Sequence, residues 1–156
     1  MNTPLRFKSA DSKWWQKPLA LHQGRQLPAE LIILQSELGA DEQGVWLNSR
    51  GLKSGVTDLV SSSQKGLKTR RVPLPAFVSK SLTHLYKKAN VKKGCPDLVI
   101  WNITTRSMRL VEVKCPHWDR PTPEQLLFIQ AAESIGIGAK IVEWEFIKKK
   151  QQRPTT

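Results

Sequence analysis

Three charged side chains in the second half of the chain, Asp97, Glu112 and Lys114, have the types and spacing of a hydrolytic metal site. They lie in the apolar segments DLVIW and MRLVEVK, which are typical of two β-strands joined by a polar turn. If the turn is centred between Thr104 and Thr105, residues whose numbers add to 209 lie opposite each other, and Asp97 faces Glu112. Because side chains on one face of a strand recur every second residue, Lys114 shares the face of Glu112.

The chemistry of this predicted surface follows from its charges. Two carboxylates opposed in a sheet repel each other, and a divalent cation between them removes the repulsion. Carboxylate oxygens and water are the ligands that suit Mg²⁺ or Mn²⁺. Such an ion could polarise a phosphate and activate a water molecule for attack. Lys114 would orient that water or stabilise the negative charge of the transition state. The predicted reaction is phosphodiester hydrolysis. The alternative is an exposed hairpin with solvated charges, against which the apolar neighbours Val111 and Val113 of Glu112 argue.

The stretch GCPDLVIWNITTRSMRLVEVKCPHWDRPTPEQLLFIQ resembles the virus-type replication-repair nuclease (VRR-NUC) branch of the PD-(D/E)XK superfamily. The shared features are a PDL strand, an EVK strand end, a following D-R element and a helix that carries Gln, over about the last third of the chain. The resemblance implies a catalytic set and a metal-binding set. The catalytic set is Asp97, Glu112, Lys114 and Gln125, and the metal-binding set is Asp97, Glu112, Val113 and an upstream Glu.

The family pattern leaves two positions open. The upstream Glu is assigned to Glu30. Glu37 is the runner-up, because a residue seven positions further along a helix lies on nearly the same face. The alternative for Glu30 is a solvated carboxylate that stabilises a helix N-terminus. The family has Gly after the Lys, whereas this chain has Cys115, which would lie almost opposite Cys95. Packing and redox control are both open for this cysteine pair.

Net charge predicts a polyanionic partner. Twenty-five Lys and Arg residues against 13 Asp and Glu give +12, and no acidic residue occurs between Leu59 and Pro96. We expect this basic block to contact the phosphates of DNA and Trp118 to offer a base-stacking platform. The predicted nucleic-acid contacts are Lys65, Lys68, Arg70, Arg71, Lys87, Lys88, Lys92, Lys93 and Trp118.

Several other classes are disfavoured by the sequence. A run of about 18 apolar residues is missing, so neither a membrane span nor a membrane partner is expected. The first residues lack the apolar core of a secretory signal, which predicts a cytoplasmic protein, associated with the nucleoid when bound to DNA. Two cysteines are too few for a four-ligand zinc site.

The element pattern predicts an α/β fold with a mixed central sheet flanked by helices, and the resemblance implies that this fold is of the PD-(D/E)XK restriction-endonuclease-like type. Residues 1–27 are expected to form a basic extension, 28–147 the nuclease domain and 148–156 a basic tail. Proline at position 28 opens an amphipathic helix that stops near Gly39. The remaining expected elements are strands at 45–47 and 57–60, a helix at 77–89, the hairpin, a helix at 124–136 capped by Thr122, and a strand at 139–146.

The function that these features predict is a Mg²⁺- or Mn²⁺-dependent deoxyribonuclease. By resemblance, its substrate is branched, flapped or junction DNA in replication, repair, recombination or defence, and the protein acts as a homodimer or within a larger nucleoprotein complex. The alternative is a DNA-binding or assembly subunit of such a complex, with a weakly active or partner-dependent nuclease fold.

Overall fold

The strands of the protein form one mixed sheet in the computed structural model, which describes residues 3–14, 17–47, 52–63 and 66–148. The strand order is β3-β2-β1-β9-β8-β7-β4-β5-β6, with β9 parallel to both β1 and β8 and the other pairs antiparallel. This arrangement confirms the predicted α/β class with a mixed central sheet flanked by helices. The strands are β1 Leu5–Trp14, β2 Lys17–His22, β3 Arg25–Leu27, β4 Glu42–Trp46, β5 Ser54–Ser63, β6 Gly66–Pro73, β7 Leu98–Asn102, β8 Met108–Lys114 and β9 Gly138–Phe146.

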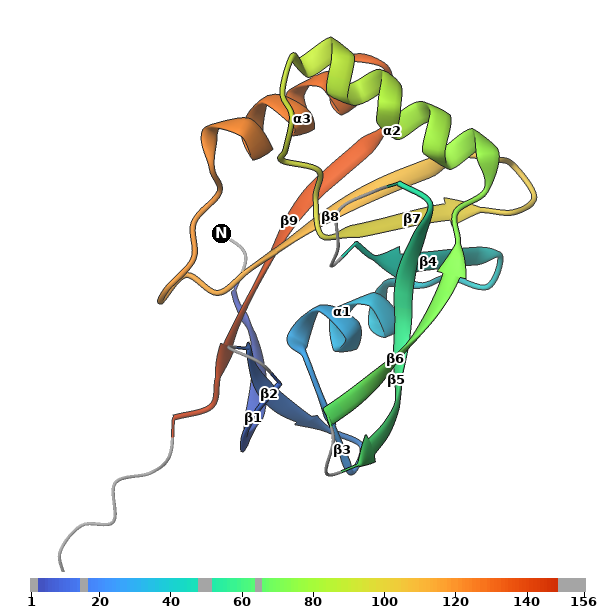
Figure 1. Ribbon diagram of the computed structural model, residues 1–156. Helices are drawn as coiled ribbons and strands as arrows, with labels where there is room; N and C mark the ends of the chain where they lie inside the picture. Colours follow the sequence, from blue (N-terminus) through green and yellow to red (C-terminus); the bar gives the residue numbers. More distant parts are fainter. Residues whose placement is uncertain (1–2, 15–16, 48–51, 64–65, 149–156) are drawn as a thin grey trace, which may run out of the picture.

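Helices cover both faces of the sheet. The helices α2 (Ala76–Ala89) and α3 (Pro123–Ser134) lie side by side on one face, and α1 (Ala29–Glu37) lies on the other. The outer strands β1 to β3 and β5 to β6 curve around α1 (Figure 1). Each face therefore has its own apolar core, one built around α1 and one around α2 and α3.

The curvature of the sheet explains why α1 differs from the amphipathic helix that the sequence predicts. Every residue from Ala29 to Leu34 is buried, including Glu30. A helix enclosed on all sides has no polar face to show in its sequence. Spacing alone was therefore a poor guide to how α1 packs.

The hairpin of β7 and β8 has the predicted register. Leu98 pairs with Val111 and Trp101 with Met108, so paired residue numbers add to 209. The side chain of Asn102 closes the turn, because its Oδ1 accepts hydrogen bonds from the backbone N–H groups of Thr104 and Thr105, both at 2.9 Å. Residues 98, 100, 111 and 113 all join the α1 core, as the alternation predicts.

The N-terminal region adds structure that the sequence analysis did not predict. Residues 5–27, which were expected to form a basic extension, contain β1, β2 and β3, and β1 pairs with β9 from the opposite end of the chain. Strand β6 was also not predicted. The predicted basic tail lies outside the described residues except for Lys148. Polar residues dominate these strands, and their pairing depends on distant partners that a local pattern does not reveal.

An arginine on the hairpin ties α1 to the sheet. The guanidinium of Arg109 donates to Glu37 Oε2 at 2.7 Å and to both carboxylate oxygens of Glu42 at 2.9 Å. Lys140 Nζ also lies 2.7 Å from Glu37 Oε1. Burial alone would raise the pKa of Glu37, but the bonds to Lys140 and Arg109 outweigh it and lower that pKa; the bond to Arg109 also lowers the pKa of Glu42.

We expect Arg109→Met to lower the free energy of unfolding by about 2 kcal/mol at neutral pH, because it removes the one guanidinium that donates to both part-buried carboxylates, Glu37 and Glu42. Both carboxyl groups have folded pKa values below the ordinary 4.5, so their stabilisation is present above that pH and is lost as pH falls through the folded values. Denaturant unfolding should therefore show a shallower loss of stability in acid for the variant. The exposed control Lys140→Met should change stability by less than about 1 kcal/mol, and an equal effect of both variants would contradict the assignment.

Candidate active site

Asp97 is fixed by backbone contacts on both sides. It directly precedes β7, and its carboxylate Oδ2 accepts a hydrogen bond from the N–H of Val113 on β8 at 2.9 Å. Its carbonyl oxygen accepts a hydrogen bond from the N–H of Leu47 at 2.8 Å. The preceding loop approaches α3 so closely that a Cβ on Gly94, whose φ is +115°, would lie 2.7 Å from the backbone of Glu124. Only glycine fits there, and the loop holds Asp97 against the hairpin.

Glu112 is the most deeply buried charge of the site. It has no exposed surface, its Oε1 accepts from Gln125 Nε2 at 3.3 Å, and its Oε2 has no hydrogen-bond partner among the described residues. Burial, together with the hydrogen-bonding and repulsive contact of Asp97, raises the pKa of Glu112 to about 9. Two neighbouring carboxylates in such a place need a proton or a cation between them.

Lys114 supplies a buried positive charge. Its Nζ lies 3.4 Å from Glu112 Oε1 and 3.2 Å from Asp119 Oδ1, and only 7% of its side chain is exposed. Burial would lower the pKa of Lys114, but the carboxylates of Glu112 and Asp119 outweigh it and raise the pKa. The group is therefore a stable ammonium, suited to stabilise negative charge or orient a water and unsuited to act as a base at neutral pH.

Gln125 joins the site to the start of α3. Thr122 caps the helix as predicted, and the two residues form a capping box in which the Thr122 hydroxyl accepts from the Gln125 N–H at 3.2 Å. The amide oxygen of Gln125 accepts from the Thr122 N–H at 2.9 Å, which aims its NH₂ group at Glu112. The cap thus orients both the helix and the side chain that holds Glu112.

The structure places Glu30, and not Glu37, beside Asp97. Both Glu30 and Asp97 line a cleft of about 1100 Å³, and the Glu30 Oε2 lies 2.6 Å from Lys17 Nζ. Burial raises the pKa of Glu30, Lys17 opposes this, and repulsion by Asp97 adds to it. Glu37 instead forms ion pairs with Arg109 and Lys140.

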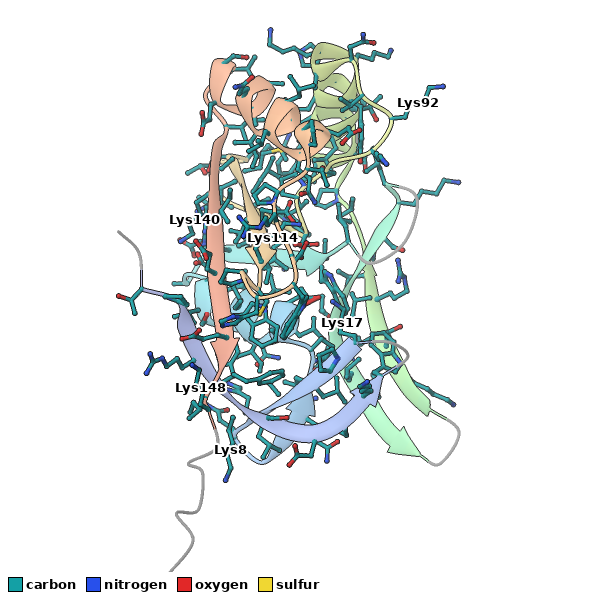
Figure 2. The ribbon with its side chains drawn as sticks, turned by 90° about the vertical axis from the view of Figure 1, so that its left-hand side faces the viewer. Lys8, Lys17, Lys92, Lys114, Lys140 and Lys148 are labelled. Atoms are coloured by element: carbon teal, nitrogen blue, oxygen red, sulfur yellow. The ribbon has the colours of Figure 1, made fainter. Side chains whose placement is uncertain are left out.

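The cleft does not reach every member of the predicted set. Glu112 and Lys114 are not among its lining residues, and Lys114 lines a second groove of about 600 Å³ between α3 and β9. Asp97 thus faces the open cleft while Glu112 lies beneath the surface. Figure 2 shows Lys114 in the middle of the molecule, with Lys140 on the neighbouring β9.

The donors at this point fit a hard divalent cation. Within the described residues, no three His, Cys, Asp or Glu side chains are grouped so that they could hold a metal ion together. The pair of Asp97 and Glu112 suffices for Mg²⁺ or Mn²⁺, which bind through one or two carboxylates and retain several waters. The unpartnered Oε2 of Glu112 is an available donor. Val113 could contribute only its backbone carbonyl, since its side chain is apolar.

The two cysteines lie in different parts of the core. Cys115 belongs to the α1 core and Cys95 packs against the α2 and α3 core, and both are free thiols. Burial raises the pKa of both groups, so they are protonated at neutral pH. Of the two interpretations left open by the sequence, the structure favours packing.

The predicted nucleic-acid contacts are spread over three places. Lys92 and Lys93 line the cleft, Lys68, Arg70 and Arg71 lie on β6, and Lys87 and Lys88 lie in the last turn of α2; all are exposed. Arg71 also hydrogen-bonds Ser54, and Lys65 lies outside the described residues. Trp118 is 58% exposed and packs edge-on against Trp144 at 5.7 Å.

Two side chains of the site were not predicted as functional. Asp119 was placed only within the D-R element of the family pattern, and it holds Lys114. No sequence pattern marked Lys17 as functional, because its contact with Glu30 depends on the unpredicted pairing of β1 and β2.

Comparison with known proteins identifies the segment that carries this geometry. Residues 67–143 match the family model of the VRR-NUC domain. These residues form a VRR-NUC domain. Asp97, Glu112, Lys114 and Gln125 all lie within it, whereas Glu30 and Lys17 precede it. Together with the mixed sheet and its flanking helices, the match confirms the predicted PD-(D/E)XK-like fold.

The chain is similar to parts of much longer curated proteins. It matches Fanconi-associated nuclease 1 of Ailuropoda melanoleuca with 40% identity over 48 residues, which are 31% of this chain and 5% of that protein. It matches the Fanconi-associated nuclease 1 homolog of Caenorhabditis briggsae with 33% identity over 95 residues, 60% of this chain and 10% of that protein. The matched region thus spans a tenth or less of the length of these relatives.

A solved structure is also similar to part of this chain. The crystal structure of paFAN1 bound to 2nt 5′ flap DNA with gap aligns at 23% identity and a TM-score of 0.38, over 47% of this chain and 14% of that one. A likeness this distant places no residue of the site. Within the described residues no helix is long and apolar enough to cross a bilayer.

Proposed function

We propose that this protein is a Mg²⁺- or Mn²⁺-dependent nuclease that hydrolyses phosphodiester bonds in DNA. The observation that carries the proposal is the burial of Glu112 beside Asp97, with a carboxylate oxygen that lacks any hydrogen-bond partner among the described residues. A protein seldom buries two adjacent carboxylates beside a single ammonium, with one carboxylate oxygen unpartnered, unless a cation or a reaction uses them. The VRR-NUC match supports the same class of reaction.

The roles of the residues follow from their contacts. Asp97 and Glu112 would hold the metal ion, which supplies Lewis-acid activation of the phosphate and of a water when bound. Lys114, whose pKa is raised by its carboxylate partners, would stabilise the negative charge that develops on the phosphate oxygens. Asp119 and Gln125 are positioning residues, because they hold Lys114 and Glu112 rather than the reacting atoms.

The surface around the cleft supports DNA as the partner. Lys92 and Lys93 stand at the cleft itself, and the hairpin of β5 and β6 carries Lys68, Arg70 and Arg71. Trp118, backed by Trp144, offers an exposed aromatic ring for a frayed base. We propose flapped or branched DNA as the substrate, in line with the flap DNA bound by paFAN1. A homodimer or a larger nucleoprotein complex would be the acting form.

A substrate panel tests this proposal. The purified protein should be incubated with labelled 5′ flaps, four-way junctions, single strands and duplexes, each with Mg²⁺, Mn²⁺, Ca²⁺ or EDTA. We expect cleavage with Mg²⁺ or Mn²⁺ only and a preference for flaps or junctions over duplexes. Salt-sensitive binding to every substrate with no cleavage under any metal would instead favour a DNA-binding subunit of a larger complex.

A further inference from the structure

Two lysine and glutamate pairs lie in the neighbourhood of Asp97. One is Lys114 with Glu112, inside the VRR-NUC domain, and the other is Lys17 with Glu30, from β2 and α1 outside it. Lys17, Glu30 and Asp97 line the same cleft, and the Asp97 carboxylate accepts a hydrogen bond from the N–H of Val113, the residue that follows Glu112 on β8. The second pair is therefore part of the charge arrangement of the cleft.

Lys17 is held in place but remains accessible. Its Nζ lies 2.6 Å from Glu30 Oε2 and 5.6 Å from the ring centroid of Trp46, which packs edge-on against Trp14 at 6.0 Å. Glu30 is only 7% exposed, whereas the side chain of Lys17 is 42% exposed and lines the cleft. An ammonium group has three N–H donors, and one carboxylate oxygen does not use them all. The buried glutamate thus acts as the anchor, and the lysine presents charge to the cleft.

We propose that Lys17 is a phosphate-binding residue of the active-site cleft, fixed by Glu30 and Trp46 so that its ammonium contacts a backbone phosphate of the bound DNA. The inference rests on the proposed function, since it names a further contact of the same site. It also gives Glu30 a role as a positioning residue in the cleft that Asp97 lines and Lys114 does not. Because the residue comes from β2, the strands that precede the VRR-NUC domain contribute directly to the site.

The test must separate a phosphate contact from a merely structural ion pair. Lys17→Met alone leaves Glu30 buried without its cation and could disturb the fold. The double variant Lys17→Met/Glu30→Gln removes both charges together and avoids this problem. Lys17→Arg keeps the positive charge. Lys8→Met is the matched control, because Lys8 is an exposed lysine of the same N-terminal strands and lies at the lower end of the molecule in Figure 2, away from Lys17 and Lys114.

Binding to a labelled 5′ flap should be measured by fluorescence anisotropy in EDTA over a range of salt concentrations, with thermal unfolding of each variant alongside. We expect the double variant to unfold near the wild-type temperature, to bind about fivefold more weakly at ~0.1 M salt and to lose about 0.9 from its log–log salt slope. Lys17→Arg should bind nearly as wild type does. Lys8→Met should change affinity by less than about twofold.

The outcomes separate this inference from the proposed function. If the double variant binds DNA as Lys8→Met does, with an unchanged salt slope, Lys17 contacts no phosphate and the inference fails, whether or not the wild type cleaves DNA. If the double variant is weakened as expected while no protein cleaves DNA, the phosphate contact stands and the nuclease proposal fails. A wild-type protein that does not bind DNA at all would overturn both.

Discussion

Lys114→Met is expected to slow DNA cleavage by about a hundred- to a thousandfold, while DNA affinity falls by less than about tenfold. The Lys114 side chain is buried and its ammonium is held by Glu112 and Asp119, so bulk water is a poor substitute for the charge once it is removed. A group that stabilises charge only as the reaction proceeds contributes to the chemical step far more than to binding.

Single-turnover cleavage with saturating protein, measured beside anisotropy binding in Ca²⁺, separates the two effects. Lys140→Met is the control, since it removes one lysine charge from the adjacent strand β9 but leaves the site intact. Asp97→Asn should show a similar loss of cleavage. Cleavage retained by both Lys114→Met and Asp97→Asn would refute the assignment of the site.

The hairpin shows how far sequence reasoning can reach. The register of β7 and β8, the shared core of Leu98 and Val111, and the Thr122 cap are local features, set by alternation, turn length and capping chemistry over a few residues. Local rules suffice there because each partner lies within about 15 positions of the other. The meeting of Asp97 with Glu112 follows directly from them.

The other half of the cleft depends on contacts that local rules do not contain. Glu30 lies beside Asp97 where the sheet curves around α1, and Lys17 meets Glu30 where β2 packs against α1. Strand β2 is held by β1, which pairs with β9 more than 130 positions away. Helical spacing left Glu37 as the runner-up to Glu30, and the structure separates the two because Arg109 forms an ion pair with Glu37. Long-range pairing therefore decided which acidic side chain faces the cleft.

Glu112→Gln is expected to raise the stability of the metal-free protein by about 1–3 kcal/mol, equivalent to roughly 3–10 °C in melting temperature, while it abolishes cleavage. Because the pKa of Glu112 is about 9, folding of the wild type at neutral pH must either bury a charge beside Asp97 or take up a proton, and the glutamine removes this cost while its N–H can donate to the Asp97 carboxylate. Thermal unfolding in EDTA measures the gain. Glu133→Gln, an exposed carboxylate on α3, should change little.

The same experiment in millimolar Mg²⁺ distinguishes a metal site from a structural ion pair. A ligand that binds only the folded state stabilises it, so Mg²⁺ should raise the melting temperature of the wild type and leave that of Glu112→Gln unchanged. If Glu112 served mainly as a partner for Lys114, its replacement would leave a buried ammonium poorly paired and lower the stability instead. The two roles thus predict opposite signs for the change in melting temperature caused by Glu112→Gln. If this variant melts at a lower temperature than the wild type and its melting temperature still rises with Mg²⁺, Glu112 is not the metal ligand.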